Sequence, residues 1–131
     1  MVQILVITHG NLASEIVNIA ASITEQPSKA LSLCLDPGFD PSEYTQKITN
    51  YIASLKSNQN LVILTDLFGG TPSNLAIPFI RKDKIEVITG LNLPMLLYLM
   101  SQPEDKDFKE LCRGAKKAGE EAIIIAGEFL S

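Results

Sequence analysis

Short apolar runs alternate along the chain with longer segments in which apolar residues recur every three or four positions. Runs of this length are too short for a lone helix and are typical of strands buried on both faces. They predict strands at residues 2–7, 30–35, 61–65, 85–89 and 122–126. The periodic segments between them predict helices over residues 12–23, 41–55 and 73–80, from residue 95 onward, and over 107–119.

The ends of the expected helices carry matching chemistry. Asn11 can cap the first helix, and Pro27 prevents that helix from continuing because proline lacks the backbone N–H group. Asp40 and Pro41 suit the cap and first turn of the second helix. Thr71 suits the cap of the third.

Alternating strands and helices predict an α/β fold, with an open, doubly wound, mostly parallel sheet of strand order about 2-1-3-4 and helices on both faces. The 131 residues lie near the commonest size of a single domain, so we expect one domain over residues 1–131. In such sheets, ligands bind outside the carboxyl ends of the strands, where the winding reverses. Chemistry is therefore expected just after Ile7 and just after Thr65.

Composition and charge exclude several classes of protein. Apolar residues make up 46% of the chain and charged residues 20%, which fits a soluble globule. Fifteen acidic residues against eleven basic ones, with no basic cluster longer than Lys116–Lys117, make nucleic acid an unexpected partner. The longest apolar stretch, residues 91–100, is too short to cross a membrane. No secretory signal is visible, and Cys34 and Cys112 lack disulfide spacing, so we expect a cytoplasmic protein with reduced thiols.

His9 is the one histidine of the sequence, and it follows the first predicted strand. A single histidine excludes zinc sites built on two imidazoles, and we expect neither a metal nor another cofactor. Asp66 follows the third strand in the same way, so the strand order 2-1-3-4 would bring the two side chains together. A carboxylate bonded to one ring nitrogen fixes the tautomer and exposes the lone pair of the other. The pair therefore predicts a nucleophilic histidine.

A glycine-rich turn follows Asp66. Gly69 and Gly70 let backbone N–H groups approach a ligand closely, and the helix start at Thr71 and Ser73 offers further donors. No nucleotide-binding glycine motif is present, so the expected ligand is one phosphoryl group on His9. Most turns of this composition merely reverse the chain, so the prediction rests on all these features together.

These features lie in sequence blocks that resemble the enzyme IIA domain of the mannose-type sugar phosphotransferase system. The blocks are Ile-Thr-His-Gly at residues 7–10 with Ala13 and Glu15 behind it, Thr-Asp-Leu-Phe-Gly-Gly-Thr-Pro-Ser-Asn at 65–74, and Gly-Leu-Asn-Leu-Pro-Met-Leu at 90–96. They keep the family's order and approximate spacing, and the resemblance spans essentially the whole chain.

The resemblance implies that His9 accepts a phosphoryl group from the phosphorylated histidine carrier protein and passes it to a IIB component, for sugar uptake by membrane transporter components. Asp66 resembles the family's partner carboxylate for that histidine. The resemblance also implies a phosphate-binding loop, which we expect to comprise Gly69, Gly70, Thr71 and Ser73. The rim on which we expect partner proteins to dock comprises Thr8, Phe68, Asn92 and Leu93.

Members of the family are also homodimers in which the C-terminal strand crosses to the partner's sheet, which implies this arrangement for residues 122–126. The alternative is an edge strand that stays within its own subunit. Some relatives continue into a fused IIB domain, whereas this sequence stops at Ser131, so we expect a separate IIB polypeptide. Phe68 and Ser73 stand at positions where members vary, which leaves the shape of the docking surface open.

Three other functions fit part of the pattern. Histidine phosphatases also use phosphohistidine, but they need an arginine where Thr8 stands and a second histidine. A receiver domain needs an acidic cluster and an aspartate acceptor, whereas Thr8 and His9 stand at that place. The remaining alternative is a small-ligand or flavin-binding module of flavodoxin-like fold without catalysis, which an absorbance spectrum would distinguish.

Overall fold

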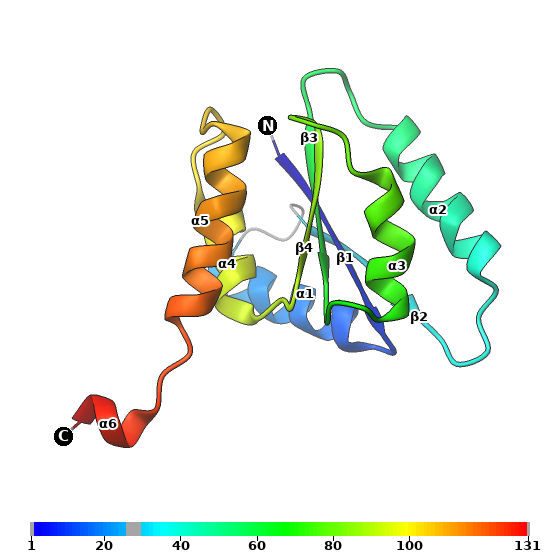
Figure 1. Ribbon diagram of the computed structural model, residues 1–131. Coiled ribbons are helices and arrows are strands. Elements are labelled where there is room, and N and C mark those ends of the chain that lie inside the picture. Colours follow the sequence, from blue (N-terminus) through cyan, green and yellow to red (C-terminus); the bar gives the residue numbers. More distant parts are fainter. Residues whose placement is uncertain (1, 26–29, 131) are drawn as a thin grey trace.

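The computed structural model describes residues 2–25 and 30–130 of the chain. Within them, four parallel strands form one sheet in the order β2-β1-β3-β4 (Figure 1). The strands are β1 (Val2–His9), β2 (Ala30–Leu35), β3 (Asn60–Thr65) and β4 (Ile85–Thr89). The structure confirms the predicted α/β fold and its strand order.

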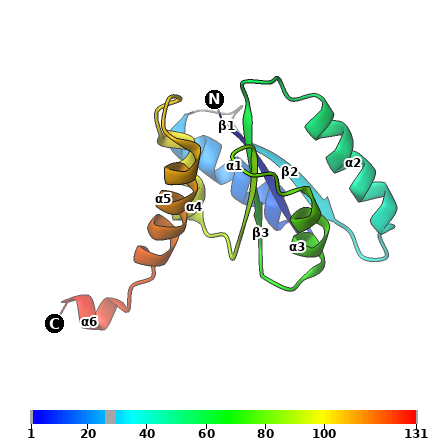
Figure 2. The ribbon, with the colours of Figure 1, turned by 45° about the horizontal axis from the view of Figure 1, so that its top comes forward.

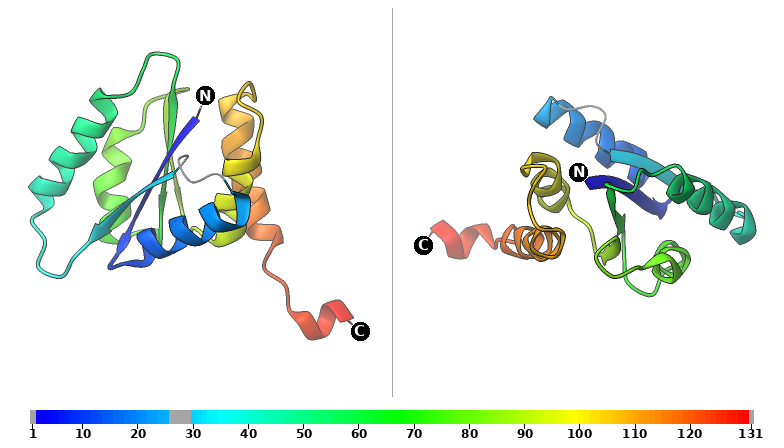
Figure 3. Two further views of the ribbon diagram at one scale, coloured as in Figure 1. Left: turned by 180° about the vertical axis from the view of Figure 1, so that it is seen from behind. Right: turned by 90° about the horizontal axis from the view of Figure 1, so that it is seen from above.

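Helices cover both faces of the sheet. They are α1 (Leu12–Thr24), α2 (Pro41–Ala53), α3 (Thr71–Ala76), the 3-10 turn η1 (Ile77–Phe79), α4 (Leu93–Ser101), α5 (Phe108–Glu121) and α6 (Ala126–Leu130). Successive residues of β1 point to opposite faces: Ile4 and Val6 pack with α1, α4 and α5, whereas Leu5 and Ile7 pack with α2 and α3. The view from above in Figure 3 shows these two layers on either side of the strands.

The parallel register gathers the carboxyl ends of the strands at one edge, the lower edge in Figure 1. Ile7 of β1 lies opposite Thr65 of β3, and Thr65 lies opposite Thr89 of β4. Beyond these residues, β1 continues to His9 and β3 gives way to Asp66. The two places at which chemistry is expected therefore adjoin each other.

Cap residues set where the helices begin. At α2, the Asp40 side chain accepts a hydrogen bond from the backbone N–H of Ser42 at 3.0 Å, as the sequence predicts. At α3, Gly70 is the cap and Thr71 is the first helical residue, one position earlier than expected. Pro27, which we expected to end α1, lies outside the described residues.

The third helix is shorter than the sequence predicts. One helix is expected over residues 73–80, but α3 ends at Ala76 and the chain continues as η1. Pro78 explains the change, because it lacks the N–H group that would donate to the carbonyl of Asn74 in a continued α-helix.

The prediction of a strand at residues 122–126 is wrong for the described chain. Helix α5 ends at Glu121, residues 122–125 have no regular structure, and α6 begins at Ala126. Figures 1 and 2 show this segment leaving the end of α5 and standing clear of the sheet. The apolar run predicts burial, but a strand also needs a neighbouring edge, and the direction in which α5 ends carries residues 123–125 away from one.

Among the described residues, no helix combines the length and the apolar character that a bilayer crossing requires.

Candidate functional site

His9 lies at the carboxyl end of β1 with its side chain 54% exposed. Its ring Nδ1 is 2.8 Å from Oδ2 of Asp66, which follows the neighbouring strand β3. Parallel pairing of β1 with β3 produces this contact between residues far apart in the sequence. The structure thus brings together the two side chains that the sequence singles out.

The Asp66 carboxylate is largely buried and fully engaged with the loop. Oδ2 also accepts a hydrogen bond from the backbone N–H of His9 at 3.0 Å, and Oδ1 accepts one from Leu67 at 3.1 Å. Burial raises the pKa of Asp66, but the hydrogen bonds and charge of His9, together with the backbone of Asp66 itself, hold that pKa below its ordinary value. Asp66 is therefore ionised at neutral pH.

An ionised carboxylate can only accept hydrogen bonds, so the contact assigns the proton of the His9 ring to Nδ1. The lone pair of a neutral ring then lies on Nε2. Because half of the side chain is exposed, Nε2 is a nucleophile that an external group can reach. Asp66 also stabilises the positive charge that develops when Nε2 forms a bond.

Gly70 places the loop after β3 against this ring. A Cβ atom at Gly70 would lie 3.0 Å from Cε1 of His9, closer than side chains normally approach. Gly69 has a φ of +85°, in the left-handed region that favours glycine. The two glycines therefore let the backbone turn sharply and pass close to the imidazole.

Ser73 supports this loop from inside and does not face a ligand. It is completely buried, and its hydroxyl donates to the Gly70 carbonyl at 2.9 Å while accepting from the Gly69 N–H at 3.2 Å. The position of Ser73 therefore does not support the prediction that it binds phosphate, because its hydroxyl is used within the loop. Thr71, by contrast, is half-buried at the start of α3.

Thr8 also differs from its prediction as part of the docking rim. Its side chain is completely buried, and its Oγ1 accepts a hydrogen bond from the backbone N–H of Ala13 at 2.7 Å. This bond ties the first turn of α1 to the end of β1 and fixes the turn that carries His9. Thr8 cannot contact a partner protein without unfolding that turn.

The other predicted rim residues lie at the same edge in different environments. Phe68 is highly exposed, and the neighbouring Leu67, which the sequence analysis did not single out, is half exposed. Leu93 is half-buried and packs against the core. Asn92 is held by two hydrogen bonds, accepting from Met95 N–H at 3.0 Å and donating to the Gly119 carbonyl at 2.9 Å.

A separate groove of about 480 Å³ runs between β4 and α5. Its lining includes Glu86 and Thr89 from β4 and Cys112 and Arg113 from α5. Burial, and then the charge of Glu86, raise the pKa of the Cys112 thiol to about 12, so this thiol stays protonated and is a poor nucleophile. Among residues 2–25 and 30–130, no three His, Cys, Asp or Glu side chains gather into a metal-binding group.

Comparison with known proteins identifies the family to which this sequence is similar. Residues 3–116 match the sequence model of the family described as PTS system fructose IIA component, where PTS denotes the sugar phosphotransferase system. The chain belongs to this family. The match includes His9, Asp66 and the whole glycine loop.

Relatives of this IIA chain carry related names. It is 29% identical over 124 residues to the PTS system mannose-specific EIIAB component of Escherichia coli K12, a match that covers 93% of this chain and 38% of that protein. It is 24% identical over 131 residues to the fructose-specific EIIA component of Bacillus subtilis 168, covering 99% of this chain and 90% of that protein. The chain therefore spans less than half the length of the mannose-specific relative.

A solved structure shares the fold of the IIA chain. The crystal structure of the phosphotransferase system component EIIA from Streptococcus agalactiae matches with a TM-score of 0.86 at 23% identity, over 98% of this chain and 99% of that one. This likeness shows that the arrangement of strands and helices is that of a IIA component.

Proposed function

We propose that this IIA chain is a phosphoryl carrier, in which His9 accepts a phosphoryl group from the phosphorylated histidine carrier protein and passes it to a IIB component. The observation that carries the proposal is the 2.8 Å contact between Asp66 and the Nδ1 atom of an exposed His9. That contact leaves Nε2 free to react and provides the charge that compensates the phosphorylated ring.

The first transfer is an in-line displacement at phosphorus. The Nε2 lone pair of His9 forms a new N–P bond while the N–P bond to the donor's histidine breaks, and that histidine keeps the electron pair. Positive charge appears on the His9 ring, where the ionised Asp66 stabilises it through the Nδ1–H hydrogen bond. The second transfer runs in the opposite sense, because a nucleophile of IIB attacks phosphorus and His9 Nε2 leaves.

The glycine loop supplies the phosphate contacts in this proposal. Gly70 brings the backbone to the ring, and Gly69 provides the turn that makes this approach possible. Thr71 opens α3 beside them and offers a half-buried hydroxyl. Positioning and N–H donors are sufficient for phosphoryl transfer of this kind, because the protein needs only to align the groups and compensate their charge.

Partner proteins dock around His9 in this proposal. Leu67 and Phe68 expose apolar surface in the loop that follows Asp66, and Asn92 and Leu93 lie in the loop and helix start after β4 at the same edge. Both partners must release quickly, so we expect an interface of modest affinity.

We also propose a homodimer in which the C-terminal segment of each chain pairs with β4 of the other. β4 is an edge strand of the described sheet and borders the groove of about 480 Å³. Ile123, Ile124 and Ile125 are each more than half exposed in the single chain, as expected for a segment whose packing partner lies elsewhere.

Two variants test the separate roles of His9 and Asp66 at the site. His9→Ala removes the nucleophile and should abolish phosphorylation by phosphoenolpyruvate, enzyme I and the histidine carrier protein. Asp66→Asn keeps the shape of the side chain but loses its charge, so transfer should slow while binding of the carrier protein is retained. Rapid-quench experiments measure the rate of phosphoryl transfer, and calorimetry measures binding of the carrier protein. Equal loss of carrier binding in both variants would contradict these roles.

A further inference from the structure

The outer edge of β4 is partly closed by its own chain. β4 is an edge strand of the described sheet, and the carbonyl of Lys84, just before it, accepts a hydrogen bond from the Leu61 N–H of β3 at 2.9 Å. Backbone groups of successive residues in a strand face opposite sides, so those of Ile85, Val87 and Thr89 point away from β3. These are the groups to which a further strand would bond.

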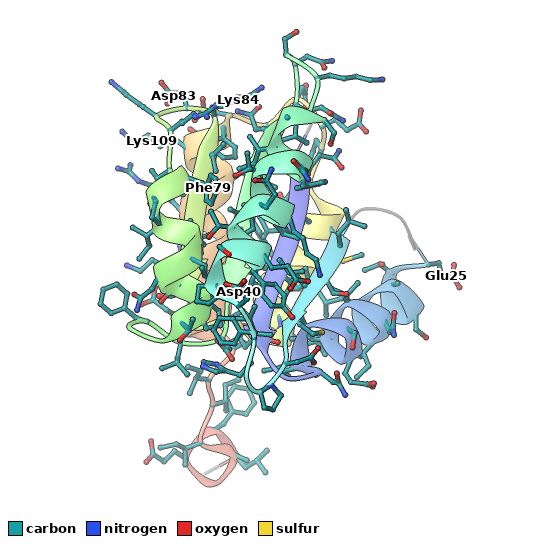
Figure 4. The ribbon with its side chains drawn as sticks, turned by 90° about the vertical axis from the view of Figure 1, so that its right-hand side faces the viewer. Glu25, Asp40, Phe79, Asp83, Lys84 and Lys109 are labelled. Atoms are coloured by element: carbon teal, nitrogen blue, oxygen red, sulfur yellow. The ribbon has the colours of Figure 1, made fainter. Side chains whose placement is uncertain are left out.

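The turn before β4 closes the first of these residues. The Ile85 N–H donates to the Arg81 carbonyl at 2.9 Å, and the Ile85 carbonyl accepts from the Arg81 N–H at 3.0 Å. Figure 4 shows Asp83 of this turn at the same end of the molecule as Lys109 of α5. A further strand therefore finds both backbone groups of Ile85 in use, and its pairing is confined to the rest of β4.

A carboxylate closes the second residue. The Val87 N–H donates to Oε1 of Glu86 at 2.9 Å, so the neighbouring side chain uses this edge donor. The Glu86 side chain lines both the groove of about 480 Å³ and a second cavity of about 290 Å³. Charged side chains at the edge of a sheet hinder pairing with another chain. A strand that pairs with β4 must therefore displace the Glu86 carboxylate from the Val87 N–H.

Arg113 of α5 can receive the displaced carboxylate. Arg113 lines the same two cavities as Glu86. Within residues 2–25 and 30–130, its guanidinium group forms no ion pair. An incoming strand would cover the Glu86 carboxylate, and a covered charge without a partner is costly. An ion pair with Arg113 would compensate the charge of Glu86.

The homodimer proposed above supplies a strand for this edge. Ile123, Ile124 and Ile125 are 77%, 57% and 67% exposed, and they lead away from their own sheet. These three residues match the length of β4 that remains beyond Ile85 and Glu86, which is residues 87–89. The run carries no charge, so the carboxylate at the edge must find its counter-charge on its own chain.

We propose that Glu86 is a gate on the β4 edge, which opens when residues 123–125 of a second copy of this chain pair with residues 87–89. In the closed state, the Glu86 carboxylate occupies the Val87 N–H. In the open state, the carboxylate pairs with Arg113 and leaves the Val87 N–H to the incoming strand. The proposal rests on the homodimer proposed above and adds to it the residue that controls assembly.

Removal of the carboxylate tests the gate through the dissociation constant of the dimer. Glu86→Ala should lower the Kd measured by sedimentation equilibrium about tenfold, because a hydrogen bond to a charged acceptor is worth more than an exposed ion pair. Glu120→Ala is the matched control. Glu120 is a second carboxylate that lines the groove, but it stands on α5, and in the described chain it does not bond the Val87 N–H. The Kd of this control should equal that of the wild type.

Two further measurements test the two states of the gate separately. In the dilute monomer, the Val87 amide hydrogen should exchange faster in Glu86→Ala than in the wild type, because its hydrogen bond in the closed state is lost. Arg113→Ala should raise the dimer Kd about threefold when Glu86 is present and leave it unchanged in the Glu86→Ala background, because the open state then has no carboxylate to pair.

Several outcomes would overturn the proposal. A Glu86→Ala chain whose dimer Kd equals that of Glu120→Ala, or whose Val87 amide exchanges at the wild-type rate, would show that Glu86 does not close the edge. An effect of Arg113→Ala that persists without Glu86 would contradict the open state. Wild-type and Glu86→Ala chains that both sediment as monomers would contradict the homodimer itself and the gate with it, whereas failure of the gate alone leaves wild-type dimers in place.

Discussion

At the scale of single residues, the Asp66 carboxylate determines the state of His9. One oxygen accepts hydrogen bonds from both the backbone and the ring of His9, at 3.0 and 2.8 Å. The ring is thereby held at one orientation and in one tautomer before any partner arrives. An asparagine at this position could keep the geometry but could not supply the negative charge.

The lowered pKa of Asp66 predicts how stability depends on pH. A carboxyl group with a depressed pKa in the folded state stabilises the fold above its unfolded pKa, near 3.8, and this contribution is lost as pH falls through the folded value. At neutral pH, Asp66→Asn should therefore lower the free energy of unfolding by about 1 kcal/mol, the typical net worth of a hydrogen bond.

Urea unfolding of the wild type and of Asp66→Asn at several pH values measures this difference. It should shrink as pH falls below 3.8 and approach zero only below the lowered pKa of the folded state, where Asp66 is protonated in both the folded and the unfolded states. A difference that stays constant over this range would contradict the assigned ionisation.

The single histidine and its carboxylate could be found from the sequence because each follows a buried apolar run directly, and parallel strands end at one edge. The roles of Thr8 and Ser73 could not be predicted from the sequence. Each lies in a sequence block that also contains exposed residues. Only the path of the backbone directs the Thr8 hydroxyl to the Ala13 N–H and the Ser73 hydroxyl to the Gly70 carbonyl.

At the scale of elements, Asn92 joins two helices. It caps α4 through the Met95 N–H and donates to the Gly119 carbonyl near the end of α5. Gly119 allows this approach, because a Cβ there would lie 3.2 Å from the Asn92 side-chain oxygen and 3.0 Å from Met95 Cε. Asn92 therefore fixes the place from which the C-terminal segment leaves the fold.

Exchange of amide for carboxylate separates the two roles of Asn92. Asn92→Asp keeps a good cap for α4 but replaces the donor by an acceptor that faces the Gly119 carbonyl, so it should lower the free energy of unfolding by about 1–3 kcal/mol. The reverse exchange at α5, Asp107→Asn, is the control, since Asp107 accepts a capping bond from Glu110 N–H. Denaturant melts should show little change for this control. An Asn92→Asp variant as stable as the wild type would show that the hydrogen bond from Asn92 to the Gly119 carbonyl does not contribute to stability.

At the scale of the whole molecule, the structure differs from the sequence-based prediction in the C-terminal segment. An Ile-Ile-Ile run predicts a buried strand, but burial depends on which surface is available, and the run follows α5 in a direction that leads away from its own sheet. The four strands that do form were predictable because a helix follows each of them, and the helices between successive strands return the chain to the sheet.

The proposed homodimer predicts a specific effect at this segment. Ile124→Asp should convert a dimer to a monomer, because it places a charge in the strand that would be buried against the partner's β4. Ile80→Asp, at an exposed isoleucine at the end of η1, should leave the dimer intact. Sedimentation equilibrium measures both masses. A wild-type chain that sediments as a monomer, or a variant that stays dimeric, would contradict the exchange of C-terminal strands.

The central claim is that His9 carries the phosphoryl group, and the most direct measurement locates that group. The wild-type chain is incubated with phosphoenolpyruvate, enzyme I and the histidine carrier protein, and intact mass is followed by peptide mapping at neutral to alkaline pH. The account predicts one acid-labile phosphate on the peptide that contains His9. A phosphate on any other residue, or an unmodified chain beside a fully phosphorylated carrier protein, would contradict it.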